Sequence, residues 1–560
     1  MPLPETNRMV PGNHIGTGYA TIEQWLGTAP EFDHIDEILE ADVIVCGAGL
    51  AGVTATRSAV DHGASVLLFE KSTSVQGRSG DFGTVGSKVS ERWGRKAEAS
   101  KADILHHFMK ESAWWPRARI IKAWLEECGN TLDWYISARE DLVILDHTTD
   151  PVPEDGRPWL QPARYPGPTG AIAPNDETYP SYPITAEFRP SHVPILKANL
   201  KKACADGDVR VFYETPVKKL LIDSTGRVTG VVAKSYDGKI YEAHAHNGVI
   251  LATGDYSGNL DMLYWYCPWV RANPNPFTAV DRNGDYVDTG DGHRMGMWIG
   301  AQMERGPHAP MAHNMGGPLG VAPYLELDRN GERFMNEDVS GQQIENQLAN
   351  LPGQISWQIF DDEWQAQLPM MPASHGVICM ELNSDDVAAH KVNYTLNGPD
   401  GYITRKEFDG IFDNAEESDD GIPGSQSYYR ANSLEELIKK TGMPLETALA
   451  SIARYNELAE SGIDTDFGKR SERMFSIKTG PFYAAKLEPS AVLVSMSGLD
   501  SDQYAHCLNA QGTPIPGLYV CGNVQGGRFA VEYSITVPGM SHSMAMTYGR
   551  IAGRNAALKI

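Results

Sequence analysis

A regular alternation of apolar runs and turns begins near residue 42. Asp42 precedes the apolar run Val43–Cys46, which is followed by glycines, a helix-compatible stretch to about His62 and a second run, Val66–Glu70. Short apolar runs bounded by turn residues are typical of buried strands. The pattern therefore predicts a strand, a turn, a helix and a second strand.

Further apolar runs, separated by Asp/Gly turns, predict four strands between residues 209 and 253. We expect them to form a three-stranded meander that returns to a parallel sheet. The four runs are Val209–Tyr213, Val217–Ile222, Val228–Lys234 and Gly248–Thr253.

The region from about residue 305 to 490 has a different pattern. It is richer in Pro, Gly, Asn and acidic clusters and lacks a repeated strand–helix rhythm, which predicts an inserted α+β domain. Beyond it, a helix is predicted over Ser541–Leu558. Its small residues allow close packing against a neighbouring element; they are Ala545, Gly549, Ala552 and Gly553.

Composition narrows the classes of function. Hydrophobic residues make up 41% of the 560 residues, which is ordinary globular usage, and the 72 acidic residues exceed the 48 basic ones to give a net charge of −24. Such a charge repels phosphate backbones and anionic membranes, so we expect no nucleic-acid partner. No apolar window approaches the ~20 residues of a membrane span, and no export signal is recognised. We therefore expect a soluble, cytoplasmic protein.

The cysteines indicate neither disulfides nor metal ligands. There are seven, they are scattered, and none is spaced as Cys-x-x-Cys. This pattern is typical of reduced thiols, without a zinc ribbon, an iron–sulfur cluster or a haem attachment. We expect no metal site.

The glycine-rich turn after the first predicted strand indicates a nucleotide site. Residues 47–52 read Gly-Ala-Gly-Leu-Ala-Gly between a strand and a helix. In this pattern Gly47 allows the tight turn, Gly49 lets the backbone approach a pyrophosphate, and Gly52 lets helix and strand touch. The helix N-terminus supplies N–H groups for the phosphates. Glu70, after the second strand, would accept a hydrogen bond from a ribose hydroxyl.

Two further glycine segments indicate a dinucleotide larger than NAD. Glu70 is followed by Lys71-Ser72 and by the run Gly77–Gly83, which could wrap a second phosphate and a flavin. Near the other end of the chain, residues 516–523 read as a strand that enters a glycine turn with a polar Asn523. Such a turn is suited to a ribityl chain.

Together these motifs resemble the fumarate reductase and 3-ketosteroid dehydrogenase family of FAD enzymes. The resemblance runs from about residue 38 to 560 in the family's order. Besides the segments above, it rests on Leu251–Gly254, Thr289–Gly292, Asn330–Glu337, Gly517–Asn523 and Tyr548–Gly553.

The resemblance implies an α/β fold with a Rossmann-like FAD-binding domain built from both ends of the chain and an inserted α+β capping domain. We expect an N-terminal arm over 1–37, the first part of the FAD-binding domain over 38–304, the capping domain over 305–494 and the second part of the FAD-binding domain over 495–560. No histidine lies between Gly77 and Gly86, where the membrane-complex branch attaches its flavin, so we expect noncovalent FAD.

The expected FAD contacts come from both ends of the chain. They are Gly47, Ala48, Gly49, Ala51, Gly52, Glu70, Lys71, Ser72, Gly77, Arg78, Ser79, Gly80, Val217, Thr253, Gly254, Asp291, Gly522, Asn523, Ser541 and His542.

The chain departs from the fumarate-reducing members, which bind two carboxylates with arginines and histidines. No arginine follows Asn336-Glu337, and the segment Val494–Gly498 lacks the family's histidine. From the forward count, Tyr533 stands where a third cationic group, an arginine, occurs in those members. Because unpaired charges in a buried site are costly, these departures disfavour fumarate.

Tyr533 is the leading candidate for the catalytic acid. The ketosteroid branch uses tyrosines near a Tyr-Pro-Gly in this segment, and Val537-Pro538-Gly539 follows Tyr533 here. A phenol can donate a proton at neutral pH. The alternative is a core tyrosine with a satisfied hydroxyl.

Arg528 and His542 are the next candidates, Arg528 to hold a polar end of the substrate and His542 near the pyrimidine edge of the flavin. Each has a purely structural alternative. The backbone N–H groups of Ser541 and His542 could bond flavin O2 at the start of the last helix. His308 and His313 lie where fumarate-type members keep a substrate histidine, but we expect core or solvated histidines.

Aromatic residues are dense at Tyr264–Trp269 and at Trp114-Trp115. They could line a flat apolar cleft or form an ordinary core at a domain interface. With the missing cations, they favour an apolar enone of steroid, bile-acid or phenolic type as the substrate.

The sequence therefore predicts a flavin ene-reductase, or the reverse dehydrogenase, acting on a carbon–carbon bond conjugated to a carbonyl. One alternative is a reductase of an unsaturated carboxylate, anchored by Arg528 and Arg78. Another is an electron-transfer subunit of a larger complex. The sequence shows no second nucleotide fingerprint and no haem or cluster motif, so the electron donor or acceptor is unidentified.

Overall fold

The computed structural model divides the chain into two compact units. The large unit comprises Pro2–Ala163, Ile184–Met311 and Val492–Ile560, and the small unit consists chiefly of Ala312–Ala491. The structure describes residues 12–94, 100–147, 150–162, 182, 184–312, 318–320, 322–367, 370, 391–393, 402–413 and 427–560.

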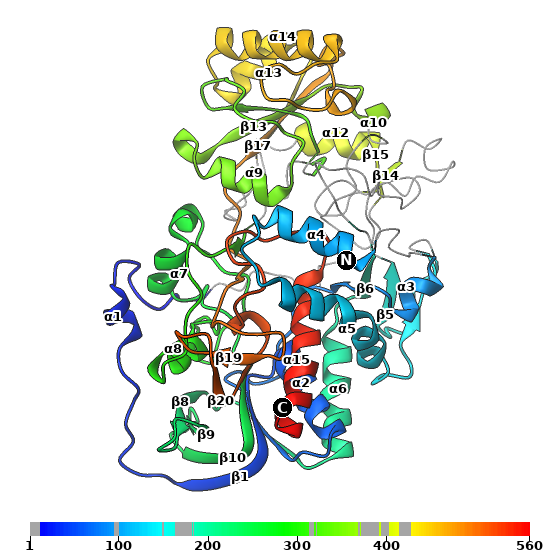
Figure 1. Ribbon diagram of the computed structural model, residues 1–560. Helices are drawn as coiled ribbons and strands as arrows, with labels where there is room; N and C mark the ends of the chain where they lie inside the picture. Colours follow the sequence, from blue (N-terminus) through cyan, green and yellow to red (C-terminus); the bar gives the residue numbers. More distant parts are fainter. Residues whose placement is uncertain are drawn as a thin grey trace. The chain divides into compact units, whose positions relative to one another are not determined.

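The large unit is built on a mainly parallel sheet (Figure 1). Its central strands pair in parallel in the order β20-β10-β1-β2-β7, and β19 adds to β20 in the antiparallel direction. These strands are β1 (Glu37–Cys46), β2 (Val66–Phe69), β7 (Val209–Phe212), β10 (Ile240–Leu251), β19 (His506–Leu508) and β20 (Pro514–Val520).

The predicted meander is partly wrong. The hairpin β8 (Val217–Ile222) and β9 (Val228–Lys234) does lie antiparallel to the first half of β10. However, β7 pairs with β2 at the edge of the parallel sheet. Strand β10 also begins at residue 240 rather than 248, because its first half lies between β1 and β9 and needs no continuous apolar run.

The first strand also begins earlier than the apolar run predicts. Glu37 and Glu40 are part of β1, in register with Tyr241 and His244 of β10. The exposed positions of this stretch are Ile38 and Glu40, so the acidic side chain of Glu40 points to solvent. Glu37, at the start of the strand, is half-buried and pairs with Lys239. Residues 12–36 belong to the large unit as well, and Asn13 forms a bridge with Asp285.

Helices α2 (Leu50–Asp61) and α15 (Met540–Leu558) pack together against the sheet, and Figure 1 shows the red α15 beside the blue α2. A Cβ added to Gly549 would lie 2.3 Å from the backbone oxygen of Ala51, and one added to Gly553 would lie 2.2 Å from that of Ala55. The predicted close packing is therefore confirmed at these two glycines.

The remaining elements of the large unit surround this pair of helices and the sheet edges. A second sheet has the order β3-β6-β5-β4, and β11 pairs with β18. Their bounds are β3 (Asp81–Gly83), β4 (Val143–Ile144), β5 (Trp159–Pro162), β6 (Thr185–Arg189), β11 (Pro310–Met311) and β18 (Val494–Ser495). The helices are α1 (Ile22–Leu26), α3 (Lys88–Arg92), α4 (Lys101–Glu111), α5 (Ala118–Ile136), α6 (Val193–Asp206), α7 (Leu260–Tyr266), η2 (Pro268–Ala272), α8 (Asp291–Trp298) and η6 (Gly522–Val524).

The small unit contains an antiparallel sheet in the order β12-β13-β17-β16. Alternate residues of β12 and β13, such as Leu325, Leu327 and Ile359, enter one apolar core, whereas Phe360 enters another. The strands are β12 (Leu325–Asp328), β13 (Ser356–Phe360), β16 (Tyr428–Ala431), β17 (Phe482–Leu487) and the pair β14 (Lys391–Asn393) and β15 (Tyr402–Thr404). The helices are α9 (Gly341–Leu348), η3 (Pro352–Gln354), α10 (Trp364–Gln367), α12 (Arg405–Asp413), α13 (Leu434–Thr441), α14 (Leu445–Ser461) and η5 (Ser471–Arg473).

The mixed α/β class predicted from the sequence is confirmed by this arrangement. Among the described residues, none of the helices combines the length and the apolar character that crossing a bilayer requires.

Candidate functional site

The glycine turn after β1 has the geometry of a phosphate-binding turn. Gly47 has a φ of 107°, and a Cβ there would lie 2.3 Å from the backbone oxygen of Ala252. A Cβ on Gly52 would lie 1.8 Å from the oxygen of Gly47. Gly49 differs, because the nearest atom to its Cβ position is the oxygen of Gln76 at 3.9 Å. Space is therefore open at the N-terminus of α2, where backbone N–H groups favour an anion.

Glu70 lies directly beside this turn. Its buried carboxylate accepts hydrogen bonds from the N–H groups of Ala48 and Ser72, both at 2.6 Å. Burial raises the pKa of Glu70, and these hydrogen bonds oppose the shift. The backbone oxygen of Glu70 also accepts the N–H of Thr215, two residues before Val217. The structure thus brings three predicted contact residues together, Ala48, Glu70 and Ser72, and the strand with Val217 begins two residues after Thr215.

The second glycine segment runs alongside the first. The N–H of Gln76 donates to the oxygen of Ala48 at 3.3 Å. A Cβ on Gly77 would lie 2.8 Å from Nε2 of His192, and a Cβ on Gly80 would lie 2.2 Å from the oxygen of Phe188. Only glycine lets this segment pass so close to its neighbours. It therefore approaches the open space at Gly49.

Thr253 and Gly254 continue from the end of β10 toward α8. Gly254 has a φ of 76°, and a Cβ there would lie 2.0 Å from the carboxylate of Asp288. The buried Oγ1 of Thr253 has no hydrogen-bond partner in the described part of the chain. An unpaired buried hydroxyl is unusual, and a bound polar ligand would satisfy it.

Lys71 and Asp291 pair with each other. The Nζ of Lys71 lies 3.1 Å from Oδ2 of Asp291 and 2.9 Å from Oγ1 of Thr289, while Arg294 donates to Oδ1 of Asp291 at 2.7 Å. Burial acts to raise the pKa of Asp291, but Lys71 and Arg294 outweigh it and hold the pKa well below its usual range. Asp291 is therefore an anion at neutral pH.

The C-terminal segment completes the group of contacts. Gly522 has a φ of 73°, and its Cβ position lies 2.9 Å from Cβ of Ala51 in α2. The N–H of Cys521 donates to the oxygen of Leu251, so β20 delivers Asn523 next to the end of β10. The open space at Gly49, the unpaired Thr253 hydroxyl and the converging turns fit a dinucleotide. Of the residues predicted from the sequence, Gly49, Glu70 and Thr253 are the ones whose surroundings fit FAD there.

Arg78 makes contacts that the sequence could not indicate. Its guanidinium pairs with Asp288, donates to Oγ1 of Thr278 at 2.7 Å and donates to the oxygen of Leu493 at 3.1 Å. Next to this pair, burial and the Asp288 charge raise the pKa of Asp255 to about 7. The charge of Arg78 is therefore largely offset within the protein.

Tyr533 is buried beside the start of α15. Its ring lies 5.0 Å from that of Phe529, and only 4% of the residue is exposed. Burial raises the pKa of Tyr533 to about 12, and a hydrogen bond from Ser541 opposes the shift. The phenol is therefore protonated at neutral pH, next to the second residue of α15.

Arg528 lies further along the same segment. Its Nε donates to the oxygen of Gln525 at 3.0 Å and its Nη2 to Oδ1 of Asn523 at 3.4 Å. Among the described residues, its buried Nη1 has no hydrogen-bond partner. Burial lowers the pKa of Arg528 to about 10, and Glu304 opposes this shift. Arg528 thus donates to the predicted FAD contact Asn523 and lies near the buried acid Glu304.

Glu304 is a buried acid of this site that no sequence motif indicates. Its carboxylate accepts the N–H of Gly527, and burial raises its pKa to about 7. A single glutamate in an irregular segment carries no pattern of its own. The close approach of residues 526 and 527 to Glu304, which fixes its neighbours, is visible only in three dimensions.

His542 lies in an aromatic cluster. Its ring stacks on Phe82 with centroids 5.4 Å apart and lies 5.8 Å from His192. Burial lowers the pKa of His542 to about 4, so the imidazole is neutral at pH 7. These contacts support the structural alternative for its side chain. The backbone N–H groups of Ser541 and His542 still lie in the first turn of α15.

His308 is a core histidine, as expected. Its Nδ1 lies 2.7 Å from the hydroxyl of Tyr256, its Nε2 lies 2.9 Å from the backbone oxygen of Glu304, and its ring stacks on Tyr266 at 4.2 Å. His313 lies outside the described residues.

The two aromatic groups differ in their environment. Trp114 and Trp115 are 59% and 61% exposed, so neither belongs to the core of the large unit. In the other group, Tyr266 is buried and Trp265 is exposed. The interpretation of the tryptophan pair as a core at a domain interface stays a prediction.

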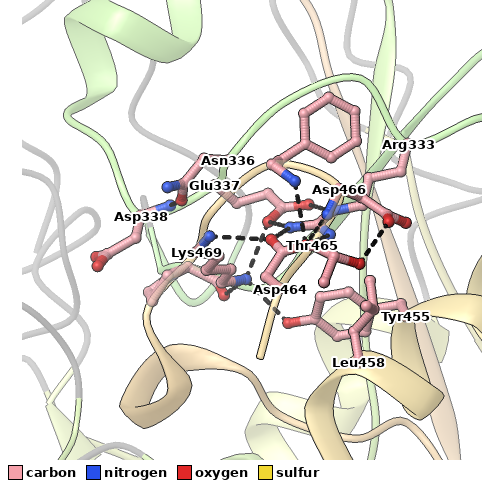
Figure 2. Close-up of polar contacts among 12 residues, drawn as sticks. Arg333, Asn336, Glu337, Asp338, Tyr455, Leu458, Asp464, Thr465, Asp466 and Lys469 are labelled. Carbon is pink, nitrogen blue, oxygen red and sulfur yellow. Dashed lines mark hydrogen bonds and ion pairs between the residues drawn. The ribbon is translucent and has the colours of Figure 1, made fainter. Parts of the chain in front are cut away.

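In the small unit, the Asn330–Glu337 motif forms a buried ionic cluster (Figure 2). Arg333 donates to Glu337 at 2.9 Å and to Asp464 at 2.8 Å, and Lys469 donates to Glu337 at 3.0 Å and to the hydroxyl of Tyr455 at 2.9 Å. Glu337 and Asp464 together raise the pKa of Arg333 against the effect of burial. The cluster fixes the turn before α9.

The turn itself also contains paired charges. Asp338 is buried and lies 3.0 Å from Nε of Arg470 and 2.6 Å from Nη1 of Arg473. Arg470 and Arg473 therefore lie next to the turn, and both pair with Asp338.

Comparisons with known proteins agree with the geometry. The chain matches the family described as FAD binding domain over residues 42–533. It is 27% identical to a vinyl phenol reductase of Lactiplantibacillus plantarum, over 92% of this chain and 96% of that one. It is 24% identical to a probable fumarate reductase of Shewanella frigidimarina, over 92% of this chain and 74% of that one.

A similar fold occurs in a solved structure. The 3-ketosteroid-Δ4-(5α)-dehydrogenase of Rhodococcus jostii, in complex with 4-androstene-3,17-dione, has a TM-score of 0.65 to this chain. Its identity is 22%, with coverage of 95% of this chain and 99% of that one. Since the family match spans most of the sequence and includes the glycine turn, the chain belongs to the FAD binding domain family and is an FAD-dependent oxidoreductase.

Proposed function

We propose that this protein reduces, or in the reverse direction introduces, a carbon–carbon double bond conjugated to a carbonyl in an apolar substrate. FAD, when bound, supplies the hydride from N5, and the protein must orient the substrate and provide a proton. The substrate class suggested is a steroid-like, bile-acid-like or phenolic enone. The relatives are named for reactions on unsaturated compounds, which supports this class of reaction.

The observation that carries the proposal is the position of Tyr533. Its protonated phenol lies against Ser541 in the first turn of α15. We infer that the N–H groups of this turn face the pyrimidine edge of FAD, where they would stabilise negative charge. A proton donor beside that turn is suitably placed to complete a reduction whose hydride comes from the flavin.

The environment of the arginines supports an uncharged substrate. Arg78 pairs with Asp288, and the charge of Arg528 is opposed by the nearby Glu304. Neither arginine therefore offers a full unpaired positive charge to a carboxylate. With its unpaired Nη1, Arg528 can still donate a hydrogen bond to a carbonyl oxygen of the substrate.

The tryptophan pair adds a flat apolar surface in the same part of the large unit. Trp114 and Trp115 follow α4, and the N–H of Arg117 donates to the oxygen of Gly527 at 2.9 Å, next to Arg528. Two exposed indoles beside the segment that carries Arg528 and Tyr533 suit an aromatic or polycyclic substrate.

A reductase of an unsaturated carboxylate is the second candidate, since one of the relatives is a probable fumarate reductase. The experiment that separates the two is an anaerobic one. The purified protein is reduced chemically, and vinyl phenols, steroid enones, acrylates and fumarate are compared as oxidants of its flavin. Rapid reoxidation by fumarate, with no response to the enones, would contradict the first candidate.

The Tyr533→Phe variant tests the proton donor. The ring and its packing against Phe529 are retained, so FAD should remain bound while turnover falls by about 10². The flavin absorbance of the purified variant and its steady-state rate measure the two effects. Unchanged turnover would remove Tyr533 from the reaction.

A further inference from the structure

One half-buried acid holds the loop that follows Tyr533. Glu111, the last residue of α4, accepts hydrogen bonds from Oγ of Ser534 at 2.6 Å, from the N–H of Ile535 at 3.3 Å and from Oγ1 of Thr536 at 2.5 Å. Three consecutive residues thus donate to one carboxylate that comes from 423 residues earlier in the chain.

The loop has little other regular support. Residues 533–536 lie in neither a helix nor a strand, yet Ser534 and Thr536 are fully buried. Their hydroxyls also lie 2.7 Å from each other. A buried irregular segment must pair its polar groups to remain in one conformation. Glu111 accepts from three donors at once, so removing it takes the acceptor from the Ile535 N–H and leaves the two hydroxyls with only each other.

We propose that Glu111 is a positioning residue for Tyr533, whose carboxylate holds residues 534–536 and thereby keeps the phenol beside Ser541. This inference rests on the proposed role of Tyr533 as the proton donor. Glu111 has no contact with substrate in this scheme and acts through the loop alone. A displacement of about 1 Å of a catalytic group is enough to slow a reaction strongly.

The groups around Tyr533 shift its pKa in opposite directions, and Glu111 is one of those that raise it. Burial has the largest effect on its pKa, Asp81 of β3 and Glu111 of α4 raise the pKa further, and Arg528 and the Ser541 hydrogen bond lower it. The carboxylate of Glu111 therefore also favours the protonated phenol, the form that can donate.

The test is a double-mutant cycle. Glu111→Ala should lower kcat by about 10-fold to 100-fold and change KM by less than about 3-fold, because the substrate-binding groups stay in place. Glu111→Gln retains a carbonyl acceptor and should lose less. In the Tyr533→Phe background, Glu111→Ala should cost less than about 2-fold more, since the group it positions is already gone. Losses that multiply in the double variant would overturn the proposal.

A second measurement, hydrogen exchange, tests without any activity assay whether Glu111 holds the loop. Hydrogen exchange at the amide of Ile535 should accelerate in Glu111→Ala and less so in Glu111→Gln, which keeps a carbonyl acceptor, and an unchanged rate in Glu111→Ala would overturn the proposal. The matched control is Asp42→Ala, which removes a carboxylate that accepts two hydrogen bonds from Ser65 elsewhere in the sheet. It should alter neither the exchange of Ile535 nor kcat.

If Tyr533→Phe alone kept full activity, the proposed function would fail. The exchange rate of Ile535 would still decide whether Glu111 holds the loop.

Discussion

Two glycines of one turn, Gly49 and Gly52, differ in whether the fold or the cofactor site requires them. The Cβ position of Gly52 lies 1.8 Å from a backbone oxygen, whereas the nearest atom to that of Gly49, outside its chain neighbours and among the described residues, lies 3.9 Å away. Gly49 also has a φ of −74°, which alanine adopts without strain. The fold itself therefore requires a glycine at position 52. At position 49 we expect the glycine to be required by the bound cofactor.

The pair gives a prediction for cofactor binding. Gly49→Ala should leave the melting temperature of the flavin-free protein unchanged and weaken FAD binding by about 10-fold or more, because a methyl group would occupy the space of the pyrophosphate. Fluorescence titration of the flavin-free protein with FAD measures the affinity.

Gly52→Ala is the matched control. It should destabilise the flavin-free protein by about 1–3 kcal/mol or more, as overpacked sites do. Equal loss of stability in both variants would contradict the assignment of the open space to the cofactor.

At the residue scale, the sequence predicts groups that belong to a local motif. The positions of Gly47, Gly49, Gly52 and Glu70 follow from a pattern of 24 residues, and the structure brings them together. Glu111 and Glu304 could not be predicted, because each meets its partners across hundreds of residues and lies in no motif. The pairing of Arg78 with Asp288 was hidden for the same reason.

At the scale of elements, the packing of α15 on α2 depends on missing side chains. Gly549 and Gly553 bring the backbones of the two helices together, and Oγ of Ser58 donates to the oxygen of Arg550 at 2.7 Å across the contact. Such a contact tolerates no added carbon atoms. The N-terminal turn of α15 is thereby fixed relative to the glycine turn at the start of α2.

Gly553→Val should therefore destabilise the protein by more than about 3 kcal/mol, since a Cβ alone would lie 2.2 Å from the oxygen of Ala55. Chemical denaturation of the flavin-free protein measures this loss. Leu558→Ala, at the half-exposed end of the same helix, should stay within about 0.5 kcal/mol of the parent. A similar value for both variants would show that the helices do not meet at Gly553.

Helices with a strong apolar period could be predicted from the sequence. Strands whose limits and places depend on their pairing partners in the sheet could not. Helices α2 and α15 end within one residue of their expected limits. In contrast, the first halves of β1 and β10 contain charged residues such as Glu37 and Glu242, which only their pairing partners place in a sheet. Likewise, the place of β7 beside β2 follows from a crossover that periodicity does not encode.

At the scale of the whole molecule, the net charge of −24 bears on the choice of substrate. This field repels anions in solution, so a carboxylate substrate needs a local cationic site to be captured. For an uncharged enone, KM should change by less than about 2-fold between 20 mM and 500 mM salt. A carboxylate held by arginines should instead show a KM that rises strongly with salt.

Steady-state kinetics at constant pH over this salt range would measure the effect, with kcat as the internal control. A steep rise in KM for the best substrate would favour the carboxylate reductase over the enone reductase.

The contact between α2 and α15 also bears on how the protein is made. Ser58 and Arg550 are separated by 492 residues, and synthesis at about 5–20 residues per second places roughly 25–100 s between their emergence from the ribosome. Throughout that interval the nascent first half exposes the apolar surface that α15 later covers. The packing of α2 is therefore completed only when nearly the whole chain has been synthesised, so the first half of the chain does not acquire its final core while it is being made.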